Sequence, residues 1–335
     1  MKNRREFLKE MAAGVAILGA ETKFTMGGVK TATDTVGKSK VVIVRDEKLR
    51  TPGPGPDGQR VVAMLDHAMQ TYAGSRNPVE PWKRLVHPGQ VVGLKVNTIA
   101  GKGLSTHVSL VEAICERLQQ AGIRPGDIIV WDRTNHELER AEYTLSNSAG
   151  KVRCFGTDSA EVGYEDEQVS FGRVKTQLSK ILTQCDVVIN VPILKHHGMP
   201  GVTFAMKNMY GVIKNPNQQH GGGCNPYIAD LNAIPEIRNK LRFIVGDVMT
   251  SQYHHGPGFD PAYTWNYNGL MVGEDRVAID YTGLQIIRRK RAEMGMPTLE
   301  QAGTPPLYIA TAADAEHRLG TNDPARIALV ETTVG

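Results

Sequence analysis

Cysteine is scarce in this sequence and is never arranged as a metal-binding pair. The 335 residues include four cysteines that lie far apart, with no Cys-x-x-Cys spacing, namely Cys115, Cys154, Cys185 and Cys224. Ferredoxin-type clusters and structural zinc sites need closely spaced thiolates. The spacing therefore argues against both, and no iron–sulfur cluster is expected. Only Cys224, inside Gly-Gly-Gly-Cys-Asn-Pro, is expected to be exposed enough to react.

Several motifs of common enzyme classes are also absent. The sequence contains no Gly-rich dinucleotide fingerprint, no P-loop and no nucleophile elbow. Its 39 Lys and Arg are nearly balanced by 35 Asp and Glu, and they are scattered along the chain. A nucleic-acid-binding surface needs a clustered basic face. These absences remove the commonest α/β enzyme classes and predict no nucleic-acid partner.

The N-terminus carries an export pattern. Arg4-Arg5-Glu6-Phe7-Leu8-Lys9 precedes a weakly apolar stretch, residues 11–20. This order is typical of a twin-arginine signal, and ten residues are too few to span a bilayer, which takes about 20. We expect residues 1–37 to be signal and leader, and the twin-arginine translocase to be a partner. The mature protein is then periplasmic or otherwise exported, with membrane contact only through an uncleaved signal.

Short apolar runs alternate with helical patterns over residues 38–335. Apolar residues at helical spacing in 61–72 and 110–118 lie among expected strands at 41–44, 91–97 and 127–132. A further helix is expected over 227–239 and a strand at 307–310. Strand, helix, strand order predicts parallel pairing. We therefore expect an α/β fold with a mostly parallel sheet flanked by helices. It is built as a composite single unit or as two closely packed lobes.

Polar side chains gather where the expected strands end. The four groups are Lys95 with Asn97, Asp132 with His136, Lys195 with His196 and His197, and Asp247 with His254 and His255. In open parallel sheets, ligands bind in the crevice beyond the carboxyl ends of the strands. The four groups together predict one polar crevice at that edge.

Lys207 lies in an otherwise apolar segment, Phe204-Ala-Met-Lys207-Asn208-Met-Tyr, and is expected to be partly buried. A buried lysine must find an anionic partner or lose its charge. A buried Lys207 could bind an anion, form a Schiff base, act as a general base or attach a cofactor covalently. The alternative is a lysine whose side chain extends out to solvent and has no such role. The candidate catalytic residues are Lys207, His196, His197 and Lys195. A glycine-rich loop follows at residues 214–224 and suits a mobile lid or a close backbone approach to a ligand.

Two further groups of residues are candidates for binding. If His196 and His197 continue a strand, they face opposite sides, so one is free to ligate a metal. A divalent transition-metal site of mixed nitrogen and oxygen ligands is one hypothesis, built from His197, Asp247, His254 and His255. Asp280 falls on the apolar side of a helix, which is costly without a partner such as Lys207 or Lys95. The candidate ligand-binding residues are Lys95, Asn97, Asn208, Asp230, Asn232 and Asp280.

The chain resembles a family whose activity is unsettled. Leu94-Lys95-Val-Asn97, Val191-Pro-Ile-Leu-Lys195-His196-His197 and Gly201-Val-Thr-Phe-Ala-Met-Lys207-Asn208 are similar to motifs of the domain-of-unknown-function 362 family, as are Asp230-Leu-Asn232 and Val277-Ala-Ile-Asp280. The resemblance covers roughly residues 40 to 333. Many relatives carry an added ferredoxin-like segment whose cysteines this chain lacks. The resemblance implies a fold and site positions rather than a reaction.

A fainter similarity is to the nickel-pincer lactate racemase family. Thr134-Asn-His136-Glu137 and the run from His197 to Lys207 look like its cofactor-site elements, although Phe204-Ala-Met stands where that family has Ser-Gly-Gly. The likeness implies that Lys207 anchors a cofactor and that His136, His196 or His197 is a ligand or acid/base.

The leading functional hypothesis is an exported α/β protein whose enzyme-like crevice binds a small anionic ligand or cofactor, with metal assistance left open. The alternative is a non-catalytic periplasmic factor that holds a cofactor or metal, or assembles it, for a partner.

Overall fold

The computed structural model describes residues 37–335, apart from residues 52 and 54. The expected signal and leader, residues 1–37, lies outside the described residues except for Gly37. Within the described part of the chain, no helix is both long and apolar enough to cross a membrane.

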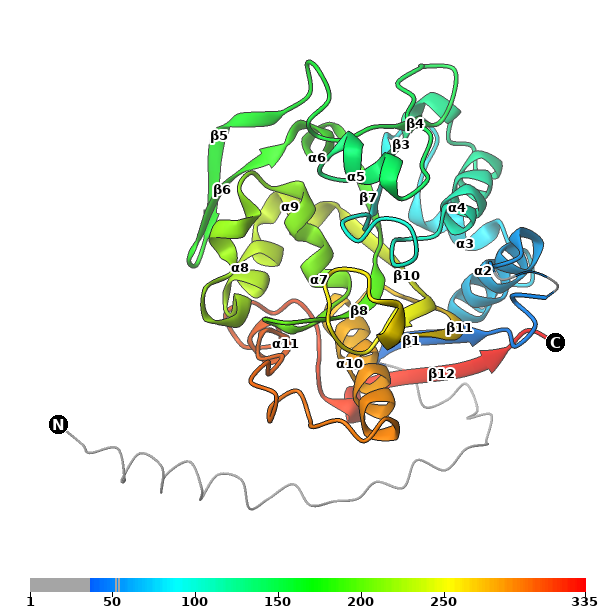
Figure 1. The fold of residues 1–335 in the computed structure, drawn as a ribbon. Coiled ribbons are helices and arrows are strands. Elements are labelled where there is room, and N and C mark those ends of the chain that lie inside the picture. The colour runs from blue at the N-terminus through cyan, green and yellow to red at the C-terminus, as the bar shows by residue number, and fades with distance from the viewer. Residues whose placement is uncertain (1–36, 52, 54) are drawn as a thin grey trace, which may run out of the picture. The chain divides into compact units, whose positions relative to one another are not determined.

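A ten-stranded sheet forms the centre of the described chain (Figure 1). Its main path runs in the order β12-β1-β11-β10-β7-β2-β3-β4, with β8 and β9 attached to β10, while β5 and β6 form a separate ribbon. The strands are β1 (Ser39–Arg45), β2 (Val92–Val96), β3 (Ile128–Trp131), β4 (Arg153–Cys154), β5 (Tyr164–Phe171), β6 (Val174–Ser179), β7 (Val187–Val191), β8 (Ile193–His197), β9 (Gly201–Thr203), β10 (Leu241–Gln252), β11 (Thr264–Gly273) and β12 (Ile327–Thr333).

The sheet is mostly parallel, as the sequence predicts. Along its main path β11 is antiparallel to both neighbours, β1 and β10, while the other neighbouring pairs are parallel. β8 pairs in parallel with β10, and β9 runs antiparallel to β8. The carboxyl ends of β2, β3, β7 and β10 therefore meet at one edge of the sheet.

Helices cover both faces of the sheet. They are α2 (Gly58–Ala73), α3 (Glu80–Leu85), α4 (Val108–Gln120), α5 (Asn135–Arg140), α6 (Lys180–Gln184), α7 (Ala205–Asn208), α8 (Tyr227–Ala233), α9 (Pro235–Lys240), α10 (Arg276–Glu293) and α11 (Tyr308–Ala312). Figure 1 shows α2, α3 and α4 on one side and α8, α9 and α10 on the other. Both layers of helices thus pack on the same main sheet.

Strand alternation divides the apolar side chains between two cores. In β1, Val41 and Ile43 join the core beneath α7 to α11, whereas Val42 and Val44 join the core beneath α2 to α4. Successive side chains of a strand point to opposite faces, and a strand covered on both faces reads as a continuous apolar run. This is why the sequence shows short uninterrupted apolar runs rather than an alternating pattern.

The chain leaves the sheet in opposite directions after two adjacent strands. β2 leads to α4, which packs in the core of α2 and α3, whereas β7 and β8 lead to α7 and α8 in the other core. β2 and β7 are hydrogen-bonded neighbours. Such a switch point is where open α/β sheets bind ligands.

Two local predictions from the sequence are wrong. Residues 307–310 read as a strand but form the start of α11, because a four-residue apolar run does not distinguish strand from helix. Residues 227–239 read as one helix but divide into α8 and α9 at Ile234, which is extended before Pro235.

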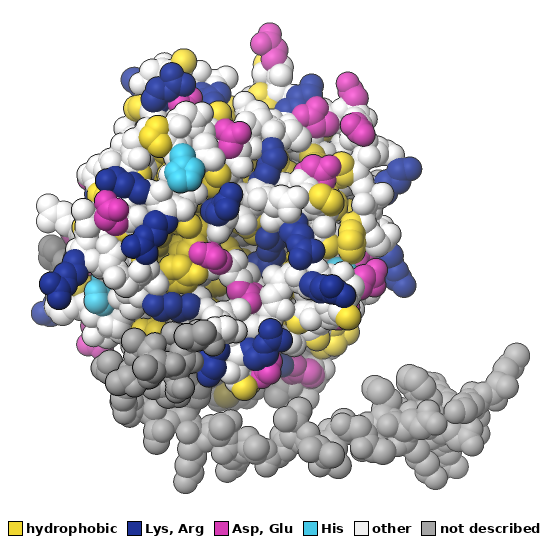
Figure 2. Space-filling view, turned by 180° about the vertical axis from the view of Figure 1, so that it is seen from behind, with side chains coloured by type: hydrophobic (Ala, Val, Ile, Leu, Met, Phe, Trp, Pro, Cys, Tyr) yellow, Lys and Arg dark blue, Asp and Glu magenta, His cyan; other side chains and the backbone are white. Residues whose placement is uncertain are grey.

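Charged side chains are mixed on the surface seen in Figure 2, where Lys and Arg alternate with Asp and Glu. That face carries no continuous basic patch.

A glycine in the centre of β2 makes room for two large side chains. A Cβ atom on Gly93 would lie 2.5 Å from the Trp131 ring and 2.8 Å from Cys185 Sγ. Because overpacking a core costs about 1–3 kcal/mol, Gly93→Ala should lower the free energy of unfolding by that amount in urea denaturation. Gly58→Ala is the control, since no atom lies within 4 Å of a Cβ atom on Gly58, which opens α2. Equal losses in the two variants would contradict the packing argument.

Candidate functional site

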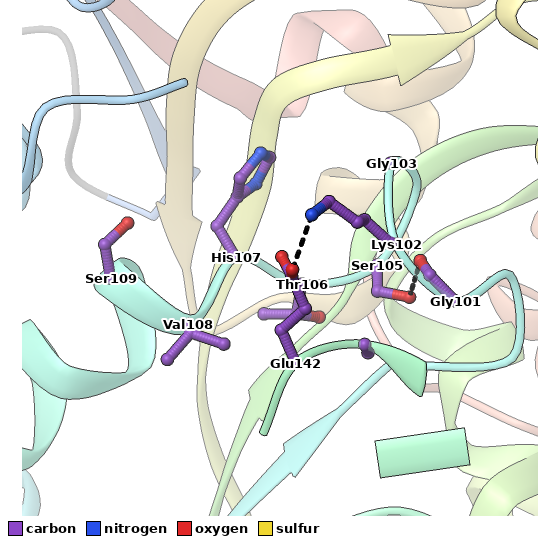
Figure 3. A pocket seen from close by; sticks show the side chains of 10 residues that line it. Gly101, Lys102, Gly103, Ser105, Thr106, His107, Val108, Ser109 and Glu142 are labelled. Atoms are coloured by element: carbon purple, nitrogen blue, oxygen red, sulfur yellow. Dashed lines mark hydrogen bonds and ion pairs between the residues drawn. The ribbon is translucent and has the colours of Figure 1, made fainter. Parts of the chain in front are cut away.

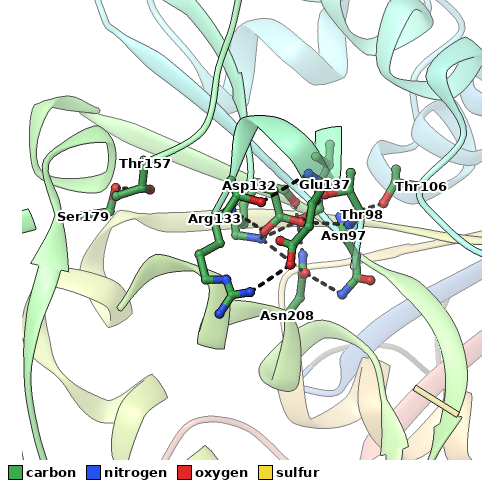
Figure 4. A network of polar contacts seen from close by, with 12 residues as sticks. Asn97, Thr98, Thr106, Asp132, Arg133, Glu137, Thr157, Ser179 and Asn208 are labelled. Atoms are coloured by element: carbon green, nitrogen blue, oxygen red, sulfur yellow. Dashed lines mark hydrogen bonds and ion pairs between the residues drawn. The ribbon is translucent and has the colours of Figure 1, made fainter. Parts of the chain in front are cut away.

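A buried ion pair lies at the switch point. Lys95 is the penultimate residue of β2. Its Nζ donates to Asp132 Oδ1 at 2.7 Å and to the backbone carbonyl oxygen of Val96 at 2.6 Å. The other carboxylate oxygen, Asp132 Oδ2, accepts from the backbone N–H and hydroxyl of Thr98. Figure 4 shows Asp132 and Thr98 close together, with Asn97 and Asn208 beside them. The pair joins two strand ends and leaves neither charge uncompensated.

Asparagine side chains extend this pair into a network. Asn208 accepts from Asn97 Nδ2 at 3.0 Å and donates to Asn190 Oδ1 at 2.7 Å. Lys195 donates to Asn97 Oδ1 at 2.9 Å and is fully buried. Three predicted ligand-binding residues, Lys95, Asn97 and Asn208, therefore lie together as expected. In this structure their polar groups contact one another, and their role toward a ligand stays a prediction.

Two predicted binding residues hold the turn that carries Lys207. Asp280, which is fully buried, accepts from the backbone N–H groups of Ala205 and Met206 at 2.6 and 3.2 Å and from the Tyr308 hydroxyl. Asn232 donates to the carbonyl of Met206 at 3.0 Å. Burial raises the pKa of Asp280 to about 7, against the hydrogen bonds that favour its charged form. Asp280 pairs with backbone rather than with Lys207 or Lys95, the partners expected from the sequence.

Lys207 is buried without a carboxylate partner among the described residues. Its side chain extends from α7 with 7% exposure, and Nζ lies 3.1 Å from His220 Nε2 and 3.4 Å from the centre of the Tyr210 ring. Burial lowers the pKa of Lys207 to about 7. The expected burial of Lys207 is confirmed.

The hydrogen bonds fix the tautomers of the two histidines beside Lys207. His220 Nδ1 lies 3.0 Å from the Pro216 carbonyl, which only accepts, so Nδ1 carries the proton and Nε2 offers its lone pair to Lys207. His197 Nδ1 accepts from the N–H of Met199, so its Nε2 carries a proton and has no hydrogen-bond partner among the described residues. Burial lowers the pKa of His197 to about 2, helped by Lys207 and His220. The Lys207 amine therefore lies beside a base, His220 Nε2, and a hydrogen-bond donor, the Nε2–H of His197.

Residues 215–224, here called the covering segment, close over Lys207. Tyr210 donates to Gln219 O at 2.7 Å, and the ring centres of His197 and His220 lie 6.1 Å apart. Cys224 is fully buried, so the prediction that it is exposed is wrong, and burial raises the pKa of its thiol. Its φ of 63° is one that glycine adopts readily and cysteine rarely.

The four predicted metal ligands are not brought together. His197 lies beside His220, whereas Asp247 accepts from the N–H and ring Nδ1 of His107. His254 and His255 stack on each other beside Tyr263, and His254 also contacts His196. The described residues contain no group of three or more His, Cys, Asp or Glu that could hold a metal ion. The structure therefore contradicts a metal site made of these four residues, because His197 in β8, Asp247 in the middle of β10 and the two histidines beyond β10 face different neighbours.

His196 and His197 point to opposite sides of β8, as strand alternation predicts. His196 accepts from Gly256 N–H at 3.3 Å, and burial lowers its pKa to about 3. It lies with the 254–255 loop and not with Lys207. The structure thus groups Lys207 and His197 and separates His196 from them.

Asp230 also lies away from Lys207's amine. It accepts from His317 Nε2 at 2.8 Å and from the N–H of Arg173, next to β6. Its carboxylate joins α8 to the β5–β6 ribbon and to the C-terminal part of the chain.

The chain matches a family model over the part that contains the candidate site. The family model described as domain of unknown function (DUF362) matches residues 92–285. The chain belongs to this family. The matched range of DUF362 begins at β2 and ends within α10, so it contains every candidate site residue named from the sequence.

Other relatives are more distant. A thylakoid-associated protein of Synechocystis sp. is 27% identical over 156 residues, and the match covers 46% of each chain, so this DUF362 chain aligns with about half of that relative. The lactate racemase apoprotein of Thermoanaerobacterium thermosaccharolyticum is 10% identical with a TM-score of 0.41, covering 77% of this chain and 59% of its own. A Thermotoga maritima protein is 10% identical with a TM-score of 0.40, covering 71% and 59%.

Residues that look like the racemase cofactor element have local partners here. Thr134 caps α5 by accepting from Glu137 N–H, Glu137 pairs with Arg133, and His136 is exposed. The likeness to the racemase is too weak to support a cofactor role for Lys207.

A second polar feature was not predicted from the sequence. His107 donates from its ring to the fully buried Asp247 at 2.7 Å and lines a surface hollow of about 200 Å³ (Figure 3). Lys102 and Glu142 pair across its rim. The sequence did not point to His107 or His220, because each contacts its partner from a loop. His107 is 140 residues from Asp247 in the sequence, and His220 is 13 residues from Lys207.

Lys95 and Lys207 should respond oppositely to removal of their charge. Lys95→Met leaves Asp132 buried and unpaired, which costs about 3–5 kcal/mol. Lys207→Met removes a charge that burial disfavours, so the free energy of unfolding should be unchanged or higher. The folded-state pKa of Lys207 lies below its ordinary value of 10.5, so its penalty is complete below pH 7 and fades as pH rises toward 10.5. Urea denaturation at pH 6 and pH 9 measures both effects.

The exposed Lys214, in the same stretch of chain, supplies the control, because Lys214→Met removes a charge that contacts only Gln177 and solvent. A loss in Lys207→Met as large as that in Lys95→Met would show that Lys207 has a stabilising anionic partner.

Proposed function

We propose that this DUF362 protein binds a small anion at Lys207, beneath the covering segment, in an enzyme-like site. The observation that carries the proposal is that Lys207 has no counter-charge among the residues that the structure describes. Buried cations in proteins are normally paired, yet the groups facing Lys207 are two neutral imidazoles, a phenol ring and a buried thiol. An anionic ligand would supply the charge that the fold omits.

Further donors surround the same position. His197 presents a protonated Nε2 without a hydrogen-bond partner among the described residues. Both Lys195 and Lys207 lower the pKa of His197, so His197 lies within the electrostatic influence of both lysines. Burial lowers the pKa of Lys195 to about 7, and its described contacts are neutral oxygens. An anion at His197 would therefore stabilise the charged form of both lysines.

The position in the fold supports the same reading. α7 follows β8 and β9 at the switch point between β2 and β7, and Asn208 joins the Lys207 turn directly to the network around Lys95. The Asp280 carboxylate fixes the two backbone N–H groups preceding Lys207. A rigid turn on a switch point is a suitable support for a binding group.

Access to Lys207 requires movement of the covering segment. The segment contacts the site through His220 and Gln219, while its glycines at 222 and 223 have positive φ. We propose that it opens to admit the ligand and closes to exclude water. This retains the lid predicted from the sequence as a proposal.

Anion binding should depend on pH in a defined direction. Sulfate is the probe, because its charge is constant between pH 6 and 9. In that range His197 is neutral, burial lowers the pKa of His220 from 6.5, and burial raises those of Tyr210 and Cys224. Lys207 and Lys195 are then the groups around the site that lose a proton, so affinity should weaken progressively above pH 7. Isothermal titration calorimetry measures it.

Lys207→Met should weaken sulfate binding at pH 6.5 at least tenfold, whereas Lys214→Met should bind as the wild type does. Asp280→Asn, which removes one acceptor from the turn, should weaken it less. Equal affinity in wild type and Lys207→Met would reject the proposed site.

We also propose that the protein is exported by the twin-arginine pathway, on the support of the Arg4-Arg5 pattern in the sequence. Replacing both arginines by lysine should retain the protein in the cytoplasm of a host with this pathway, measured by cell fractionation. Because the change leaves residues 37–335 intact, the retained protein should have the wild-type melting temperature. Equal export of both forms would contradict this proposal.

A further inference from the structure

We propose that Lys207 is a nucleophilic amine that forms an imine with a 2-oxo carboxylate, in the site bounded by His220, His197 and the covering segment. This inference rests on the proposed function, since the same site binds the carboxylate of the substrate. It adds the chemical class of the ligand and a covalent step.

The first support is the state of the amine. Imine formation needs the lone pair of a neutral lysine. Lys207 is buried with no carboxylate bonded to Nζ among the described residues, so its surroundings disfavour the ammonium form. Lys95 contrasts with it, because its Nζ donates to a carboxylate and a carbonyl at 2.7 and 2.6 Å. The structure thus pairs one buried lysine with a carboxylate and leaves another without one among the described residues.

The second support is a base at hydrogen-bond distance. His220 Nε2 lies 3.1 Å from Lys207 Nζ, and its lone pair faces the amine because Nδ1–H is committed to the Pro216 carbonyl. This distance falls within the range required of a general base. Lys195, also buried, has Asn97 Oδ1 and Leu104 O as its described contacts and no histidine at this distance.

The third support is a place for the carboxylate. His197 Nε2–H is a donor with no partner among the described residues, on the side of β8 that also carries Lys195. A carboxylate on this donor, next to Lys195, would place the adjoining carbonyl carbon toward Lys207. A 2-oxo acid carries both groups on neighbouring atoms.

The step balances without a redox partner. The neutral Lys207 amine attacks the carbonyl carbon and forms a C–N bond, while His220 takes one proton from the nitrogen and passes it to the carbonyl oxygen, which becomes a hydroxyl. His220 then takes the second proton from the nitrogen and delivers it to this hydroxyl, the C–O bond breaks, and water leaves as the C=N bond forms. Amine and ketone give imine and water. The buried surroundings keep bulk water from reversing the step while the covering segment is closed.

The test is reductive trapping on the whole protein. Pyruvate or 2-oxoglutarate with sodium cyanoborohydride at pH 7 converts an imine into a stable secondary amine, and peptide mass spectrometry locates it. We expect one adduct on Lys207 in wild type and in Lys214→Met, and none at position 207 in Lys207→Arg. No adduct on Lys207 with either acid, or labelling of exposed lysines at an equal rate, overturns the inference.

Two variants separate this inference from anion binding and from a structural role. Lys207→Arg keeps the positive charge, so it should still bind sulfate. If the wild-type protein binds sulfate but is not trapped by the 2-oxo acids, the imine alone is overturned. If it is trapped but does not bind sulfate, anion binding alone is overturned. His220→Asn keeps a donor for Pro216 O but lacks the base. It should slow trapping about 10²- to 10⁴-fold and leave the adduct on the same lysine, and an unchanged rate would remove His220 from the step.

Discussion

The buried ion pair between Lys95 and Asp132 is the interaction on which this architecture depends. It joins the ends of β2 and β3, and Asn208 extends it to the turn of α7 and to β7. Two charges in an apolar interior are tolerated only when their hydrogen-bonding capacity is satisfied. Here Thr98, Arg133 N–H and the Val96 carbonyl complete the pair. Gly211 packs so closely that a Cβ atom there would lie 2.6 Å from Lys95 Nζ.

The hydrogen-bond network around Lys95 and Asp132 supports Lys207, a buried lysine that has no carboxylate partner among the described residues. Lys207 follows a turn whose N–H groups are held by Asp280 and precedes Asn208, so its backbone is fixed on both sides. The side chain therefore stays in a place that is unfavourable for its charge. Proteins retain such local cost mainly where function needs it. Lys95, which pairs with a carboxylate, therefore supports the structure of the site, whereas Lys207, which does not, is the residue for which we propose a chemical role.

Sequence patterns predicted the layers of the fold and one half of the site. Apolar runs and helical spacing located β1, β2, β3, α2 and α4, and strand alternation correctly separated His196 from His197. The burial of Lys207 followed from its apolar neighbours. The four predicted metal ligands do not meet, because β10 continues past Asp247 to Gln252 and His254 and His255 lie beyond that end. Asp247 turns toward His107, which lies 140 residues away in the sequence.

The sequence by itself determined the α/β class, the family and the burial of Lys207, since these depend on local patterning and on motifs read along the chain. The tertiary structure decided which lysine has a carboxylate, because Asp132 and Lys95 come from different strands that meet only in the sheet. It also decided that His220 serves as Lys207's neighbour, since the covering segment folds back over α7. Pairing of charges and orientation of lone pairs are properties of distances between residues, and those distances exist only in the folded chain.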